Sequence, residues 1–189
     1  MKLISLLEKL EYTCLQGSTD QEVKNVIYDS RKVEEGSLFI CIRGAVVDGH
    51  KFVPDVVAKG AKVLIVEEAV EAPEDVTVIL VKDTRYAMAF ISAAYFGYPA
   101  EKLKTIGITG TKGKTTTTYM VKSILENAGY KVGLIGTIEA IIGDKVIPAK
   151  NTTPESYVIQ EYFHEMAEAG CDCVVMEVSS QGLMLHRRS

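Results

Sequence analysis

Apolar runs of Val, Ile and Leu recur along the first part of the chain and alternate with amphipathic stretches. Such runs, bounded by glycine or proline, are typical of β-strands, and they predict strands at 23–28, 37–42, 62–66 and 77–81. Apolar residues at helical spacing predict helices near 52–59 and 84–96. The pattern predicts a small α/β domain over residues 1–98.

A cleaner alternation follows Phe96-Gly97-Tyr98-Pro99-Ala100, which is typical of a helix end and a linker. Strands are predicted at 104–109, 131–135 and 173–178, a hairpin at 139–142 and 145–147, and helices at 114–128 and 154–169. This order predicts a mostly parallel sheet with helices on its faces. Because the last strand has the character of a central strand, the α/β domain over residues 99–189 is expected to be incomplete.

Two helix details are also predicted in this second part. In the helix at 114–128, Met120, Ile124 and Ala128 are expected on one apolar face, with Val121 and Leu125 beside them. The helix at 154–169 is preceded by Thr153, a good N-cap residue, and begins with Pro154, a good first helical residue.

The composition of the chain narrows the classes of function. Its 189 residues are 47% hydrophobic and 24% charged, which fits a packed globular protein. A net charge of -4 without a basic stripe argues against a general nucleic-acid binder. No apolar run has the length of a membrane span, no signal peptide is recognisable, and the four cysteines form no CxxC pair. A cytoplasmic monomer that acts on small molecules is expected.

The most informative segment lies between the first strand and the first helix of the second part. Glycines there allow backbone N–H groups to converge on phosphate oxygens, and the helix N-terminus adds its dipole. Lys114 is expected to reach the β- and γ-phosphates of ATP, and the Thr115 hydroxyl to bind Mg²⁺. The expected ATP-binding residues are Gly110, Thr111, Lys112, Gly113, Lys114, Thr115 and Thr116. The common spacing would place the first glycine at Ile108, so a plain strand-to-helix turn is the alternative interpretation.

An acidic residue follows the last apolar strand. Glu177 comes directly after Cys173-Val174-Val175-Met176, and a carboxylate at this point can hold Mg²⁺ directly or through water. Ligands of parallel sheets bind at the carboxyl ends of the strands, so Glu177 and the glycine-rich loop are expected to meet there. The alternative is a solvent-facing glutamate at a strand end.

The segment Gly-Thr-Lys-Gly-Lys-Thr-Thr at 110–116 resembles the phosphate loop of the Mur ligase family, which includes the folylpolyglutamate synthetases. Asn-Thr-Thr-Pro-Glu at 151–155, and Glu-Val-Ser-Ser at 177–180 followed by His186-Arg187, resemble motifs of the UDP-N-acetylmuramoyl-tripeptide synthetases of that family. Asp29-Ser30-Arg31 and the segment 44–52, with Asp48-Gly49-His50 and Phe52, resemble their uridine-binding region. The resemblance covers essentially the whole chain but only the front part of the family's three-domain architecture.

The resemblance implies roles for individual residues. Ser30, Ala45, Val46 and Val47 are implied to contact the UDP end of the substrate, and the loop 110–116 to hold ATP. The muramyl-dipeptide portion is implied to contact Asn151, Thr152, Thr153, Ser179 and Arg187. Two positions depart from the family, which often has His where Gln181 stands and Gln where Leu185 stands. Taken singly, these residues also fit a helix cap at 153–154, an ordinary turn at 29–31 and a solvated surface at Arg187.

The activity implied by the resemblance is ATP-dependent amide ligation through an acyl phosphate, in peptidoglycan precursor synthesis. Lys114 and Glu177 are the implied catalytic residues, Thr115 and Glu177 the implied metal ligands, and ATP and Mg²⁺ the implied cofactors. Family frequency favours meso-2,6-diaminopimelate as the added amino acid, with L-lysine second. A carbamylated lysine and a third domain would lie beyond Ser189, so this chain is expected to be inactive alone. A folylpolyglutamate synthetase and a non-catalytic nucleotide-binding module are the rival interpretations, and His50 and His164 are interpreted as structural or surface residues.

Overall fold

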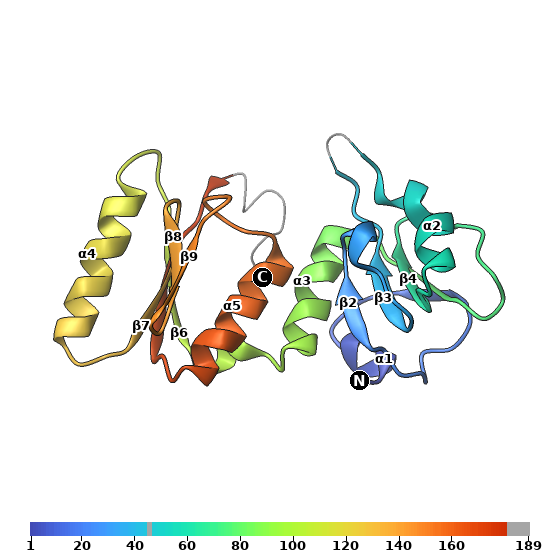
Figure 1. Ribbon diagram of the computed structural model, residues 1–189, viewed down its shortest axis with the longest axis horizontal. Helices are drawn as coiled ribbons and strands as arrows, with labels where there is room; N and C mark the ends of the chain where they lie inside the picture. The colour runs from blue at the N-terminus through green and yellow to red at the C-terminus, as the bar shows by residue number, and fades with distance from the viewer. Residues whose placement is uncertain (45–46, 181–189) are drawn as a thin grey trace. The chain divides into compact units, whose positions relative to one another are not determined.

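The computed structural model describes residues 1–44 and 47–180. The chain divides into two compact units, Met1–Tyr95 and Phe96–Ser189, and each contains a five-stranded sheet (Figure 1). Three of the four neighbouring strand pairs in the first sheet are parallel, as are two of the four in the second, and helices cover the sheets. The predicted α/β class is therefore confirmed.

The sheet of the first unit follows the order β1-β5-β4-β3-β2. Its strands are β1 (Thr13–Gln16), β2 (Asn25–Ile27), β3 (Ser37–Ile40), β4 (Val63–Val66) and β5 (Thr77–Leu80). Strands β2 to β5 are the four that the apolar runs predict, and they are parallel to one another. Strand β1 was not predicted. It pairs antiparallel with β5 at the edge, where none of its side chains is fully buried, so it has no apolar run.

Helices lie on both faces of the first sheet (Figure 1). They are α1 (Leu3–Leu6), α2 (Val53–Ala58) and α3 (Thr84–Tyr95). The 3₁₀ turn η1 (Ser30–Lys32) follows β2, and η2 (Gly49–Phe52) directly precedes α2. Val53 and Val56 of α2 pack against Phe39, Leu64 and Val78 on one face. Since side chains alternate along a strand, the buried neighbours Leu38, Ile40, Val63 and Ile65 belong to the opposite face.

The sheet of the second unit follows the order β6-β10-β7-β8-β9. Its strands are β6 (Lys104–Ile108), β7 (Val132–Ile135), β8 (Glu139–Ile142), β9 (Lys145–Pro148) and β10 (Cys173–Glu177), and the 3₁₀ turn η3 (Pro99–Lys102) precedes β6. Strands β6, β10 and β7 are parallel, whereas β7, β8 and β9 are antiparallel, with the predicted hairpin between β8 and β9. The last strand in sequence is thus inserted between two earlier ones.

Helices α4 (Lys114–Asn127) and α5 (Ser156–Glu168) cover opposite faces of this sheet (Figure 1). On one face, Val174 and Met176 of β10 pack with Ile159, Phe163 and Met166 of α5. On the other, Cys173 and Val175 pack with Val121 and Leu125 of α4. By the same alternation, Glu177 projects toward the face that α4 covers.

The predicted apolar surface of α4 is confirmed for Val121 and Leu125 but wrong for Met120 and Ile124. Met120 is 59% exposed and Ile124 is 65% exposed, whereas Val121 and Leu125 pack against the sheet. Successive helical residues are about 100° apart around the axis, so a face centred on Val121 and Leu125 turns their preceding neighbours away from the sheet. Both rows have helical spacing, and spacing alone did not distinguish them.

The predicted start of α5 is also wrong. The helix begins at Ser156 and its N-cap residue is Glu155, which makes no side-chain cap hydrogen bond. Thr153 and Pro154 therefore precede the helix. Among the helices of residues 1–44 and 47–180, none has the length and apolar character needed to cross a membrane.

Candidate functional site

The loop between β6 and α4 leaves the start of the helix open. Gly110 has φ 147° and Gly113 has φ 79°, values that favour glycine because other residues rarely adopt them. Helix α4 follows at Lys114, and no side chain caps its first turn. Such a turn presents free N–H groups and the positive end of the helix dipole, which favour an anion.

The side chains of this loop and of the first turn of α4 point in different directions. The Lys114 ammonium donates a hydrogen bond to the carbonyl of Gly110 at 2.9 Å, so it lies over the loop itself. The side chains of Thr111, Lys112 and Thr116 are exposed. Thr115 instead points to the strand ends, where its hydroxyl donates to Glu177 Oε2 at 3.1 Å.

The strand order explains why Thr115 and Glu177 meet. Strand β10 lies directly beside β6, with Glu177 paired with Ile108, the last residue of β6. The N–H of Val178 donates to the carbonyl of Ile108 at 2.8 Å and fixes this alignment. The structure thus brings the glycine-rich loop and the Glu177 carboxylate to one strand end, and Glu177 is only 1% exposed there.

Sequence reasoning missed a third participant, Thr137, which follows the end of β7. Its N–H donates to Glu177 Oε1 at 2.9 Å, and its hydroxyl donates to Oε2 at 3.0 Å. A Cβ on the preceding Gly136 would lie 2.7 Å from Glu177 Oε1, so glycine at this position makes room for the carboxylate. The sequence signal is weak: Gly136 and Thr137 follow the carboxyl end of a predicted strand, and this becomes informative only once the strand order is known.

The segment 151–153 meets the same strand end. The hydroxyl oxygens of Thr152 and Thr137 are 3.2 Å apart. Thr153 is buried; its hydroxyl donates to the carbonyl of Glu177 at 3.2 Å and accepts from the N–H of Ser179 at 3.0 Å. Its hydrogen bonds therefore join the segment to the end of β10 instead of capping α5. Asn151 is exposed, and Arg187 lies outside the described residues, as do Gln181 and Leu185.

The donor atoms around Glu177 fit a magnesium ion that is held jointly with a phosphate ligand. They are one carboxylate and the Thr115 hydroxyl, both hard oxygen donors of the kind that Mg²⁺ prefers. Within residues 1–44 and 47–180, no group of three or more His, Cys, Asp or Glu side chains is placed to hold a metal by itself. Mg²⁺ commonly takes one or two carboxylates and completes its shell with phosphate oxygens and water, which suits this set.

A tyrosine on α4 lies near the carboxylate but is not suited to act as a base. The Tyr119 hydroxyl donates to Glu139 Oε1 at 2.7 Å. Burial raises the pKa of Tyr119 to about 12, and the bond to Glu139 acts in the same direction. The phenol therefore stays protonated at neutral pH and remains a hydrogen-bond donor.

The first unit has a hollow of about 470 Å³ at the carboxyl ends of β2 and β3. Ser30 and Val47, two of the residues implied in uridine binding, line it; Ala45 and Val46 lie outside the described residues. The wall is mainly apolar and aromatic: Tyr28, Phe39, Ile42, Val47 and Phe52 contribute to it. A flat heterocyclic ring is the kind of ligand such a wall suits.

Asp29 and Arg31, which also line this hollow, form an ion pair with each other. Arg31 donates to both carboxylate oxygens of Asp29, at 2.9 and 2.7 Å. This hydrogen bonding is the main reason that the pKa of Asp29 falls to about 2. Asp29 also accepts from the N–H of Arg31 and so caps η1, while the Lys59 ammonium donates to the carbonyl of Ser30 at 3.0 Å. The 29–31 turn is thus held by several hydrogen bonds, and its three residues line the hollow.

The loop that closes the hollow is fastened by His50. Its Nδ1 lies 2.6 Å from Asp48 Oδ1, and its Nε2 accepts from the N–H of Glu67 at 2.9 Å. Because Nε2 accepts, the ring proton sits on Nδ1 and is donated to Asp48. His50 is 8% exposed, so the structural interpretation of this residue is confirmed. In the second unit, His164 lies against the Phe96 ring with centroids 5.7 Å apart.

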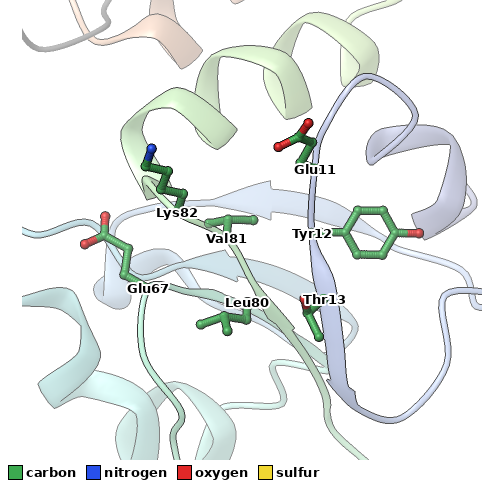
Figure 2. Close-up of a pocket in the computed structure, with 7 residues that line it drawn as sticks. All are labelled: Glu11, Tyr12, Thr13, Glu67, Leu80, Val81 and Lys82. Carbon is green, nitrogen blue, oxygen red and sulfur yellow. The ribbon is translucent and has the colours of Figure 1, made fainter.

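A second hollow in the first unit, of about 490 Å³, lies where β1 begins and β5 ends (Figure 2). Glu67 and Lys82 lie on one side of it in Figure 2, and the Tyr12 ring points away from the other side chains. The Glu67 carboxylate accepts from the N–H and the hydroxyl of Thr84, at 2.8 and 2.7 Å. Glu67 is therefore engaged in holding the start of α3.

Comparison with known protein families gives one match in each of the two units. The pattern of the Mur ligase middle domain matches residues 108–189, and that of the Mur ligase family catalytic domain matches residues 22–96. The chain belongs to the Mur ligase family. The two matched regions of this Mur ligase contain the loop 110–116 with Glu177 and the hollow around Ser30, respectively.

Curated members of the Mur ligase family resemble the whole chain. A UDP-N-acetylmuramoyl-L-alanyl-D-glutamate–2,6-diaminopimelate ligase from Clostridium perfringens is 53% identical over 187 residues, covering 99% of this chain and 39% of the relative. The ligase of the same name from Clostridium botulinum is 48% identical over 190 residues, with the same coverage. The chain thus spans about 39% of the length of these relatives.

Solved Mur ligase structures share the fold. MurF from Acinetobacter baumannii superposes with a TM-score of 0.66 at 27% identity, covering 95% of this chain and 36% of that protein. A UDP-N-acetylmuramoyl-L-alanyl-D-glutamate–2,6-diaminopimelate ligase superposes with a TM-score of 0.76 at 22% identity, covering 99% and 37%. MurF from Thermotoga maritima, solved in complex with ADP, gives a TM-score of 0.53 at 22% identity, covering 84% and 32%.

Proposed function

We propose that this chain is the uridine- and ATP-binding front part of a ligase that adds meso-2,6-diaminopimelate to UDP-N-acetylmuramoyl-L-alanyl-D-glutamate in peptidoglycan precursor synthesis. The observation that carries the proposal is the 3.1 Å hydrogen bond between Thr115 and Glu177. It joins an uncapped helix start, suited to phosphate, to a buried carboxylate, suited to Mg²⁺.

In this proposal the loop residues 110–116 hold ATP. The N–H groups of the loop and of the first turn of α4 bind phosphate oxygens, and Lys114 exchanges its bond with Gly110 for the β- and γ-phosphates. Thr115 and Glu177 hold Mg²⁺, which when bound offsets the negative charge of the phosphates.

The reaction needs two anions to approach each other. The D-glutamyl carboxylate attacks the γ-phosphorus, its O–P bond forms as the bond to ADP breaks, and an acyl phosphate results. The amine of diaminopimelate then attacks the acyl carbon, loses a proton, and phosphate leaves. The chain supplies no covalent nucleophile; Lys114 and the loop amides align the anions and reduce their repulsion.

The acceptor is held in two regions. Ser30, with the segment Ala45, Val46 and Val47, binds the UDP end, and the aromatic wall of the 470 Å³ hollow supports this assignment. Asn151, Thr152, Thr153, Ser179 and Arg187 bind the muramyl-dipeptide portion. The contacts of Thr152 and Thr153 with the Glu177 strand end support placing them next to the reacting carboxylate.

The choice of amino acid rests on the relatives. The two clostridial proteins described above are both named as 2,6-diaminopimelate ligases. L-lysine is the other candidate, and the test below compares the two amino acids.

The test is turnover of the full-length protein that contains this chain. Release of ADP is measured with ATP, Mg²⁺ and UDP-N-acetylmuramoyl-L-alanyl-D-glutamate, adding either meso-2,6-diaminopimelate or L-lysine. Ligation of diaminopimelate supports the proposal. Ligation of L-lysine but not of diaminopimelate would show that L-lysine is the amino acid added. Nucleotide binding without ligation of either would indicate a non-catalytic module and overturn the proposal.

The roles are tested by Lys114→Ala. Because the charge on the phosphates changes most in the transition state, this variant should lower turnover by about 10²–10³-fold and leave acceptor binding nearly unchanged in calorimetry. Arg187→Ala should show the reverse pattern. Lys122→Ala is the matched control, since Lys122 lies on the same helix and pairs with Glu126. Normal turnover of Lys114→Ala would contradict the assignment.

A further inference from the structure

Thr137 contacts both Glu177 and the 151–153 segment through a single hydroxyl. Its oxygen lies 3.0 Å from Glu177 Oε2 and 3.2 Å from the hydroxyl oxygen of Thr152. Its side chain is exposed, whereas the carboxylate it contacts is buried. Thr137 therefore stands at the boundary between the metal-binding acid and the surface where the acceptor is proposed to bind.

Counting protons fixes the direction of these hydrogen bonds. A hydroxyl has one proton to donate and two lone pairs, whereas an ionised carboxylate only accepts. If the Thr137 proton pointed to Thr152, a lone pair of Thr137 would face an anionic oxygen at 3.0 Å. The proton of Thr137 therefore goes to Glu177, and Thr152 donates its own proton to Thr137.

This direction has a consequence for Thr152. Its only proton is used on Thr137, so its remaining lone pairs are what it presents outward. A ligand that meets Thr152 must bring a hydrogen-bond donor, such as an amide N–H or a hydroxyl, and not a carboxylate oxygen. Thr152 thus selects among the polar groups of the acceptor.

Thr137 also controls the orientation of the carboxylate. Its N–H and its hydroxyl bind the two different oxygens of Glu177, at 2.9 and 3.0 Å, and so fix the plane of the group. Gly136 allows this close approach because a Cβ there would lie 2.7 Å from Oε1. Thr115 approaches Oε2 separately, at 3.1 Å, from α4.

We propose that Thr137 is a positioning residue whose hydroxyl couples the acceptor segment to the metal-binding carboxylate, in the order Thr152 to Thr137 to Glu177. A change at Glu177 when Mg²⁺ and nucleotide bind alters the acceptor strength that holds the Thr137 proton. That change passes to Thr152 through one hydrogen bond. The inference rests on the proposed function, because it assumes that the acceptor binds beside Thr152.

The test is a binding cycle on the full-length protein. Calorimetry measures UDP-N-acetylmuramoyl-L-alanyl-D-glutamate with and without saturating Mg²⁺·ADP, and the ratio of the two affinities is the coupling factor. The wild type should show a factor of about fivefold or more in either direction, the usual range for linked sites. Thr137→Val keeps the shape and the N–H but loses the hydroxyl, and should reduce the factor below about twofold.

Three variants separate coupling from simple structural support. Thr137→Ser keeps the hydroxyl and should restore the wild-type factor. Thr152→Val removes the other end of the chain of hydrogen bonds and should lose the factor equally, with no further loss in the double variant. Thr117→Val, at an exposed position of α4, controls for the substitution itself.

Each outcome has one meaning. If the wild type binds neither ligand, the proposed function fails. If it binds both but shows no coupling, or if Thr137→Val retains the coupling, the role of Thr137 is overturned and the proposed function stands. Should Thr137→Val melt at a much lower temperature than the wild type, Thr152→Val decides the question alone, and its retention of coupling would overturn the inference.

Discussion

The two sheets place functional groups at the same kind of edge but build those edges differently. In the first unit, the charges beside the hollow are neutralised within the fold: Arg31 holds Asp29, and Arg43 contacts Asp48 and Glu68. In the second unit, the described contacts of Glu177 are hydroxyl and N–H groups, none of them a cation. The first edge thus offers a shaped apolar wall, and the second offers a buried negative charge whose described contacts are all neutral.

The difference supports the two proposed roles, a cation site at the second edge and a site for a neutral ring at the first. Burying a carboxylate without a cation costs stability, and such a cost persists at sites where a ligand supplies the missing charge. In the first unit, the ion pairs of Arg31 and Arg43 tie together the segments around the apolar hollow and so help to hold its shape. We therefore expect changes at the second edge to affect cation-dependent events, and changes at the first edge to affect the fit of a neutral ring.

The largest expected effect is that of Glu177→Gln. The amide has almost the same shape but cannot balance the charge of Mg²⁺, so turnover of the full-length protein should fall by at least about 100-fold. The melting temperature without ligand should not fall, because a buried charge is removed. Mg²⁺·ADP should then give a much smaller thermal shift than it gives the wild type. An unchanged shift would mean that Glu177 does not hold the metal.

A pair of glycine variants gives the next largest effect and compares the edges directly. A Cβ at Gly49 would lie 2.7 Å from the backbone N of Ile42, so Gly49→Ala must displace the loop that closes the hollow. We expect a loss of about 1–3 kcal/mol in the free energy of unfolding and weakened UDP binding, with Mg²⁺·ADP binding preserved.

Gly136→Ala is the counterpart, since its Cβ would meet the Glu177 side chain. It should weaken Mg²⁺·ADP binding and preserve UDP binding. Calorimetry with the two nucleotides measures both variants. If each glycine variant weakened both nucleotides equally, the two edges would not be independent sites.

The smallest expected effect concerns pH. The pKa of Asp29 is lowered to about 2, mainly by hydrogen bonding from Arg31. A lowered pKa adds stability that is fully present above the unfolded value of about 3.9 and is lost as the pH falls toward 2. In Asp29→Asn, the free energy of unfolding should therefore fall less steeply between about pH 4 and pH 2 than in the wild type. The change should be small because the Arg31 side chain is 86% exposed, and urea unfolding at pH 7 and pH 3 would reveal it.

The sequence predicted those parts of the fold whose signal is strong and local. Buried parallel strands such as β4, with the sequence Val-Leu-Ile-Val, are apolar on both faces and stand out from their surroundings. Strand β1 and the short helix α1 lack such a signal, because β1 lies at an edge and α1 has a single turn. Met120 and Ile124 of α4 were wrongly expected to be apolar-face residues, because their row has the same helical spacing as the packed row of Val121 and Leu125.

The site was predictable where a motif exists and not where only the fold creates it. The loop 110–116 and Glu177 stand in recognisable contexts, and their contact follows from the parallel order. Thr137 belongs to no motif; only the insertion of β10 beside β7 brings it to Glu177. The alternative interpretation of Thr153 as a helix cap could not be rejected from the sequence, since a Thr-Pro pair before a helix looks like a cap whether its hydroxyl turns to the helix or to a strand.

The insertion of β10 between β6 and β7 also has a kinetic consequence. In the described sheet, β6 has β10 as its only neighbour, although 64 residues lie between Ile108 and Cys173. While the chain is being synthesised, β6 and β7 emerge before β10, the strand that lies between them. Pairing over such a sequence separation is slow, and unpaired strand edges are prone to aggregate. The site around Glu177 is therefore assembled only after β10 has paired between β6 and β7.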